Sequence, residues 1–222
     1  MSVHLAFAML ERKPKAERPA EYHDPEHASS RESKTRHEAR YRAAISLLHG
    51  EPLPPGVVLD CACGVGYGTA MLALAFPDRA VIGVDRNVAA IRTARTRYRE
   101  KNTEFYALHI RQAGAWLRGL VPVAAVVCIE TLEHLSQDLQ RLWLHRAGSA
   151  LSSNGGILVI MCPIGKGRKK PVNPWHLHEP SLEELCDHLM DAGGEVTTYP
   201  PERYHSTAGV EAWQATVVLR KP

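Results

Sequence analysis

Apolar and polar positions follow two different patterns along this chain. Between residues 29 and 48 the apolar positions recur at helical spacing, at Ala39, Ala43, Ala44, Leu47 and Leu48. Residues 50–56 hold two glycines and three prolines, so the predicted helix ends there. Beyond residue 56, short apolar runs typical of buried strands alternate with segments of helical periodicity.

This alternation predicts the class of fold. The apolar runs predict strands at 57–61, 80–84, 104–108, 123–129, 157–162, 195–199 and 212–219. Helices are predicted between them at 67–76, 87–100, 111–120, 137–151 and 181–192. Ser181 and Glu184 have the spacing of a capping box at the start of the last helix. Strands that alternate with helices require a mostly parallel sheet covered on both faces.

Composition indicates a single globular domain. The chain has 222 residues, 45% of them hydrophobic, and no apolar run has the length of a membrane span, about 18 residues. Residues 1–30 are charged and contain Pro14, Pro19 and Pro25, so we expect a flexible N-terminal arm before one domain over 31–222. Residues 3–10 are apolar but lack the flanking features of a signal peptide.

Charge and cysteine content bear on the kind of partner and on the cellular compartment. The net charge is +3 and the pI is about 8.6, which does not by itself indicate a nucleic-acid partner. The five cysteines are an odd number without framework spacing, so we expect reduced thiols and a cytoplasmic location. Cys61, Cys128 and Cys162 fall in apolar runs, where we expect them to act as small buried side chains.

The first predicted strand leads into a glycine-bearing turn, Asp60-Cys61-Ala62-Cys63-Gly64-Val65-Gly66-Tyr67-Gly68. Glycines there let the backbone turn tightly and approach a ligand, and ligands bind at this end of parallel strands. The second strand ends at Asp85, where an acidic side chain accepts hydrogen bonds from a ribose diol.

Two details distinguish S-adenosylmethionine from a dinucleotide as the ligand. Asp60 stands just before the turn, where its charge suits the cofactor's ammonium and would repel a pyrophosphate. The glycines also lack the G-x-G-x-x-G spacing of dinucleotide sites.

Four segments carry a resemblance to class I methyltransferases. The turn resembles their first motif, and 82–85 resembles the second. The run Val126-Val127-Cys128-Ile129-Glu130-Thr131-Leu132-Glu133-His134-Leu135 is similar to the fourth-strand motif of one branch that includes small-molecule O-methyltransferases, and 151–158 is similar to the stretch before the fifth strand. The resemblance implies a three-layer α/β/α sandwich around a mostly parallel seven-stranded sheet with an antiparallel last strand.

The resemblance also implies which residues bind S-adenosylmethionine. Asp60, Ala62, Gly64 and Gly66 are expected at its methionine end, Asp85 at the ribose, and Arg86 and Asn87 near the adenosine. Glu130 is expected at the pocket floor, with Cys63 and Tyr67 in the turn and Tyr41 on a helix that closes over the cofactor. Ala62 replaces a motif glycine, which is tolerable if its φ is negative. His109 takes the place of the usual acid near the adenine.

A second group of acidic and histidine residues predicts which side chains take part in the reaction. Glu130, Glu133 and His134 form Glu-x-x-Glu-His, and His176 follows later. This set is similar to the metal site of small-RNA 2′-O-methyltransferases, which implies Mg²⁺ or Mn²⁺ on these four residues. The same motif occurs in ubiquinone-pathway O-methyltransferases, where no metal is implied. Without a metal, His134 or His176 is the expected proton acceptor.

These observations leave three functions open. The leading hypothesis is methyl transfer to an oxygen of a small molecule: a sugar, nucleotide-sugar or phenol-like metabolite. The basic residues of the 165–170 loop suit an acceptor with a phosphate, or are simply solvated. The alternatives are a metal-dependent RNA 2′-O-methyltransferase and a cofactor-binding protein without catalysis.

Overall fold

The computed structural model describes residues 31–112, 122–165, 171, 173, 175–205 and 211–222. The long elements in chain order are α2 (Arg31–His49), β1 (Val57–Cys61), α3 (Tyr67–Ala75), β2 (Val81–Asp85), α4 (Val88–Arg97), β3 (Thr103–Ala107), β4 (Val123–Ile129), α6 (Gln137–Ala150), β5 (Ile157–Ile164), α7 (Leu182–Met190), β6 (Glu195–His205) and β7 (Glu211–Arg220). Two short 3₁₀ turns, η1 (Ile110–Gln112) and η2 (Leu132–His134), follow β3 and β4.

The strands form one seven-stranded sheet in the order β3-β2-β1-β4-β5-β7-β6. β1 pairs in parallel with β2 and β4, and the parallel pairing continues to β3 and β5. β7 is antiparallel to both of its neighbours. The expected mostly parallel sheet with an antiparallel last strand is therefore confirmed.

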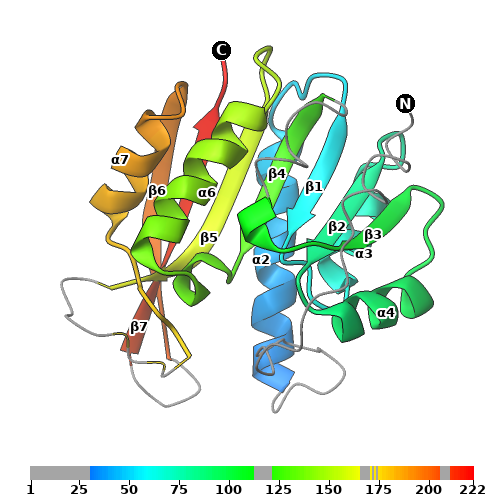
Figure 1. Ribbon diagram of the computed structural model, residues 1–222, viewed down its shortest axis with the longest axis horizontal. Coiled ribbons are helices and arrows are strands. Elements are labelled where there is room, and N and C mark those ends of the chain that lie inside the picture. Colours follow the sequence, from blue (N-terminus) through cyan, green and yellow to red (C-terminus); the bar gives the residue numbers. More distant parts are fainter. Residues whose placement is uncertain (1–30, 113–121, 166–170, 172, 174, 206–210) are drawn as a thin grey trace.

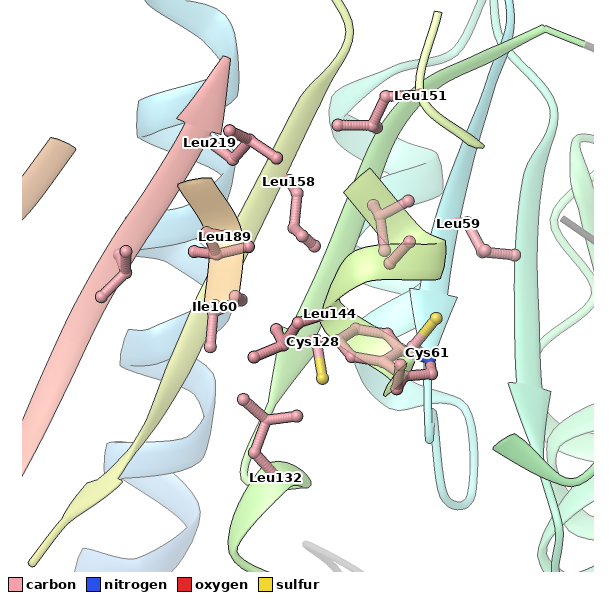
Figure 2. Packing of buried hydrophobic residues seen from close by; sticks show 14 of the residues in the cluster. Leu59, Cys61, Cys128, Leu132, Leu144, Leu151, Leu158, Ile160, Leu189 and Leu219 are labelled. Carbon is pink, nitrogen blue, oxygen red and sulfur yellow. The ribbon is translucent and has the colours of Figure 1, made fainter. Parts of the chain in front are cut away.

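Helices cover both faces of the sheet because alternate strand residues point to opposite sides. On one face, α6 and α7 pack on a cluster that includes Leu59, Leu158 and Leu189. On the other face, α2 and α3 pack on Val58, Val127 and their neighbours. Figure 1 shows α6 and α7 in front of the sheet and α2 behind it, and Figure 2 shows the first cluster between the sheet and these front helices.

Local sequence signals explain several element boundaries. Asn87 accepts hydrogen bonds from the amides of Ala89 and Ala90 and so caps α4. Ser181 and Glu184 form the predicted capping box at the start of α7. Cys61, Cys128 and Cys162 are buried and unbridged, as the apolar runs around them predict.

Some expectations differ from the structure or lie outside its described part. β5 and β6 extend to Ile164 and His205, because their pairing with β7 continues past the apolar runs. The expected arm over 1–30, most of the expected helix at 111–120 and the basic residues at 166–170 fall outside the described residues. Among the described helices, none has the length and apolar composition needed to cross a bilayer.

The order of the strands places one loop at the centre of the sheet. The chain runs from β1 outward to β2 and β3, and then returns to β4 on the other side of β1. Cys61 is in register with Val84 on β2 and with Cys128 on β4. The loops that follow these strands therefore leave the same edge at the switch point, where ligands of open α/β sheets bind.

Candidate active site

The loop between β1 and α3 and the first turn of α3 each depend on one glycine. Gly66 has φ of 90°, and a Cβ there would lie 2.6 Å from the Cβ of Ala94 and 2.8 Å from the ring of Phe105. At Gly68, a Cβ would lie 1.9 Å from the ring of Tyr41. The side of Gly64 faces open space instead. The loop is thus packed against the protein at two points and open at a third.

Ala62 corrects one expectation from the sequence. Its φ is +59°, in the left-handed region, so the condition of a negative φ, under which alanine would replace the motif glycine without strain, is not met. The chain must turn sharply after β1 so that Cys63 can donate its amide to the Val84 carbonyl and Gly64 its amide to Asp85. An alanine in this conformation stores about 1 kcal/mol of strain.

Asp60 lies beneath the loop and is fully buried. The hydroxyl of Tyr41 on α2 donates to its Oδ1 at 3.1 Å, and the hydroxyl of Thr69 on α3 donates to its Oδ2 at 2.7 Å. Burial raises the pKa of this carboxyl to about 7, although the two hydroxyl donors act in the opposite direction. Tyr41 is itself buried and packs edge-on against Tyr67.

Asp85 organises the start of α4. Its Oδ2 accepts from the Gly64 amide at 2.9 Å, and its Oδ1 accepts from the Asn87 amide at 2.7 Å. Burial raises the pKa of Asp85, and these backbone donors oppose that shift. The backbone of Arg86 is a third donor to this carboxylate, which has about four acceptor positions, so room remains for a further donor. Arg86 is exposed beside it, and His109 is half-buried after β3.

Glu130 directly follows β4 and is held by residues from distant elements. Its Oε1 accepts from Nε2 of Gln214 on β7 at 3.2 Å and lies 3.6 Å from Nη2 of Arg40 on α2. Its φ is +51°, which is strained for a residue with a side chain.

Glu133 and His134 lie in η2, one turn beyond Glu130. Glu133 is 1% exposed, and its Oε2 has no hydrogen-bond partner among the described residues. Burial, followed by the charge of Glu130, raises the pKa of Glu133 well above its usual range. His134 lies 3.2 Å through Nδ1 from the carbonyl of Trp175. Because a carbonyl only accepts, Nδ1 carries a proton, and in the neutral ring Nε2 therefore carries the lone pair.

The segment after residue 173 packs against η2. The amides of Leu177 and His178 donate to the Glu133 carbonyl. His176 donates from Nδ1 to Glu179 at 2.7 Å and accepts at Nε2 from Asn173 at 3.0 Å. This pattern fixes the tautomer of His176 in the same form as that of His134.

The structure brings together three of the four residues predicted to hold a metal. Glu133, His134 and His176 each offer one ligand atom, and these atoms lie within 4.8 Å of one another. The rings of the two histidines are 5.2 Å apart. Glu130 is not in this group, because its carboxylate is turned toward Arg40 and Gln214.

Sequence reasoning missed four residues that complete these arrangements. Thr69 and Glu179 had a local signal, since each follows a predicted site residue by a helix turn or less. Arg40 and Gln214 had none, because their contacts join positions 174 residues apart.

The comparisons with known proteins agree with this geometry. Residues 58–155, which include the glycine loop, Asp85 and Glu130 to His134, match the family model of the methyltransferase domain. Over this segment, which is less than half of the chain, the protein is therefore similar to a methyltransferase domain. Magnesium protoporphyrin IX methyltransferase from Synechocystis, solved with S-adenosylmethionine, shares its fold with a TM-score of 0.60 at 16% identity over 84% of this chain and 81% of that chain.

Two curated relatives match the methyltransferase domain in sequence. A probable S-adenosylmethionine-dependent methyltransferase of Mycobacterium tuberculosis is 30% identical over 142 residues, which make up 61% of this chain and 47% of that protein. A trans-aconitate 2-methyltransferase of Methylobacterium radiotolerans is 32% identical over 127 residues, or 56% of this chain and 45% of that protein. The chain thus spans about half the length of these relatives.

The strain at Ala62 predicts a stabilising substitution. Ala62→Gly removes the left-handed alanine and is expected to raise the free energy of unfolding by about 1 kcal/mol. Urea denaturation measures this change. The matched control is Ala43→Gly on the exposed side of α2, which is expected to lower the same free energy by about 1 kcal/mol. If both substitutions lower the free energy of unfolding, the backbone at Ala62 is not strained.

Proposed function

We propose that this protein is an S-adenosylmethionine-dependent methyltransferase that transfers a methyl group to an oxygen atom of a small molecule. The observation that carries the proposal is a pair of carboxylates, buried Asp60 and half-buried Asp85, on either side of a glycine loop at the switch point. Two carboxylates suit a cationic ligand with a ribose, and they disfavour a pyrophosphate. The match of residues 58–155 to the methyltransferase domain supports the same reading.

We assign parts in cofactor binding to Gly64 in the loop and to the charged residues around it. The acceptor capacity that Asp85 retains suits a ribose hydroxyl, while its occupied positions hold Gly64 and Asn87 in place. The open side of Gly64 admits the methionine end of the cofactor. Asp60 lies under that end and supplies negative charge, which Tyr41 and Thr69 help to keep on the oxygens. We assign Arg86 and His109 to the adenosine side.

His134 is the residue that we assign as general base. Its Nε2 lone pair lies on the side of Glu133, with 4.0 Å between Nε2 and Oε1. An acceptor hydroxyl that binds beside it can give up its proton to Nε2 as its oxygen attacks the methyl carbon. The bond from methyl to sulfur breaks at the same time, and the sulfonium becomes a neutral thioether. The Glu179 carboxylate orients His176 in the same neighbourhood.

The pKa of Asp60 predicts how cofactor affinity depends on pH. Below pH 7 the carboxyl holds a proton and is neutral, whereas the cofactor stays cationic and favours the ionised form. Affinity for S-adenosylmethionine is therefore expected to fall about fivefold from pH 8 to pH 6, as measured by calorimetry. In Asp60→Asn the affinity is expected to be weaker and flat with pH. A wild-type affinity that rises toward pH 6 would contradict the assignment.

A screen with methyl-labelled S-adenosylmethionine tests the proposed function. Sugars, nucleotide-sugars and phenols are offered to the protein, and we expect label in an ether or ester of one class. His134→Ala is expected to lower kcat at least about 100-fold with cofactor affinity unchanged, because it removes the base. His145→Ala, on the exposed side of α6, is the control. Cofactor binding without turnover of any acceptor would favour a non-catalytic role.

A metal-assisted form of the reaction is the second candidate. The convergence of Glu133, His134 and His176 favours it, together with the unpartnered Oε2 of buried Glu133. Two imidazoles and one carboxylate fit Mn²⁺ better than Mg²⁺, which prefers oxygen ligands. A bound ion supplies Lewis-acid activation of an acceptor hydroxyl.

Calorimetry with MnCl₂ tests this second candidate. Binding of one ion with micromolar affinity is expected, and His176→Ala is expected to weaken it at least about tenfold by removing one ligand. His178→Ala is the control, because the His178 ring contacts Glu184 and offers no ligand atom to the group of three donors. If wild-type and His176→Ala proteins take up Mn²⁺ equally, the metal assignment is wrong and the base mechanism stands.

A further inference from the structure

Arg40, Gln214 and Glu130 form a closed set of contacts, which we name the Glu130 clamp. Arg40 donates from Nε to Oε1 of Gln214 at 2.5 Å. Gln214 donates from Nε2 to Oε1 of Glu130 at 3.2 Å. Nη2 of Arg40 lies 3.6 Å from the same oxygen of Glu130. The Gln214 amide accepts a hydrogen bond through its oxygen and donates one through its nitrogen, so it links the Arg40 guanidinium to the Glu130 carboxylate.

The clamp is shielded from water, unlike an ordinary surface ion pair. Gln214 is 7% exposed, and the side chains of Arg40 and Glu130 are 11% and 21% exposed. A pair on the same helix gives the contrast, because Arg42 contacts Glu38 at 2.9 Å with 62% of the Arg42 side chain exposed. Partial burial strengthens the clamp, whereas an exposed pair contributes little.

The clamp joins three elements at the strained residue after β4. Arg40 is on α2, Gln214 is on β7, and Glu130 has φ of +51°. A backbone in this conformation persists only where its surroundings impose it. The amide of Glu130 donates to the Met161 carbonyl, and the clamp fixes the other end of the residue. Backbone and carboxylate are thereby both held.

The position of Glu130 affects its catalytic neighbour. Glu130 stands three residues before Glu133, which lies in the η2 turn that follows β4. Glu133 in turn lies next to Nε2 of His134. A displaced Glu130 carboxylate would therefore change the field at the proposed base as well as the shape of the site.

We propose that Arg40 and Gln214 are positioning residues, which hold the Glu130 carboxylate in the orientation that methyl transfer requires. This inference rests on the proposed function, because it takes Glu130 as part of the reacting site. Neither residue lies in the segment that matches the methyltransferase domain, so the clamp is supplied by the flanking α2 and β7. Displacement of a reacting group by about 1 Å slows catalysis on the order of 100-fold.

Steady-state kinetics with the acceptor found by the screen test the clamp. Arg40→Met and Gln214→Met are expected to lower kcat about 10- to 100-fold, with acceptor KM and cofactor affinity changed less than about twofold. Arg40→Lys is expected to recover part of the loss. Arg42→Met is the matched control on the same helix and is expected to behave as wild type. Equal kcat in Arg40→Met, Gln214→Met and Arg42→Met would overturn the proposal.

A Glu130→Gln background separates positioning from a general structural effect. If the clamp acts through Glu130, Arg40→Met is expected to change kcat less than about twofold once the carboxylate is gone. A full additional loss, or equal losses in melting temperature and cofactor affinity, would show that Arg40 acts elsewhere.

Amide hydrogen exchange tests the Glu130 clamp without the need for a methyl acceptor. In Arg40→Met and Gln214→Met, the peptide containing Glu130 to His134 is expected to exchange at least about tenfold faster than in Arg42→Met. Equal rates would overturn the clamp even if the protein proves to be a methyltransferase. If wild-type protein binds no S-adenosylmethionine, the proposed function fails instead, and the exchange rates still decide whether the clamp holds Glu130.

Discussion

The burial of one carboxylate constrains the whole site. Asp60 is removed from water, so each of its oxygens needs a donor, and the hydroxyls of Tyr41 and Thr69 supply them. This requirement brings α2 across the loop after β1 and presses the Tyr41 ring against residue 68, where only glycine leaves room. The loop, the helix that covers it and the sheet edge are therefore fixed together.

Strain at two strand ends marks the same region. Ala62 after β1 and Glu130 after β4 both have positive φ, and both follow the adjacent central strands of the switch point. The first turn directs the loop amides toward Asp85, and the second turns a carboxylate toward α2 and β7. Two neighbouring residues of α2 contact the two turns, because Tyr41 donates a hydrogen bond to Asp60 and Arg40 forms an ion pair with Glu130.

Three carboxyls at this edge are raised in pKa by burial: Asp60, Asp85 and Glu133. Such a concentration of acidic groups disfavours a phosphate and favours a cation. In the proposed function the sulfonium and ammonium of the cofactor supply positive charge beside Asp60, while Glu133 stays next to the base. The same acidity explains why a divalent ion is a reasonable second candidate at Glu133, His134 and His176.

The sequence by itself determined the alternation of strands and helices, the glycine loop and the carboxylates at the strand ends, because these depend on local periodicity and on motifs within a few residues. It also indicated that Glu133 and His134 would meet His176, through resemblance to known families. Tertiary structure alone decided the sign of φ at Ala62, because the turn there depends on the hydrogen bond from the Gly64 amide to Asp85. It alone decided the partners of Glu130, since contacts between α2 and β7 span 174 residues and leave no local pattern in the chain.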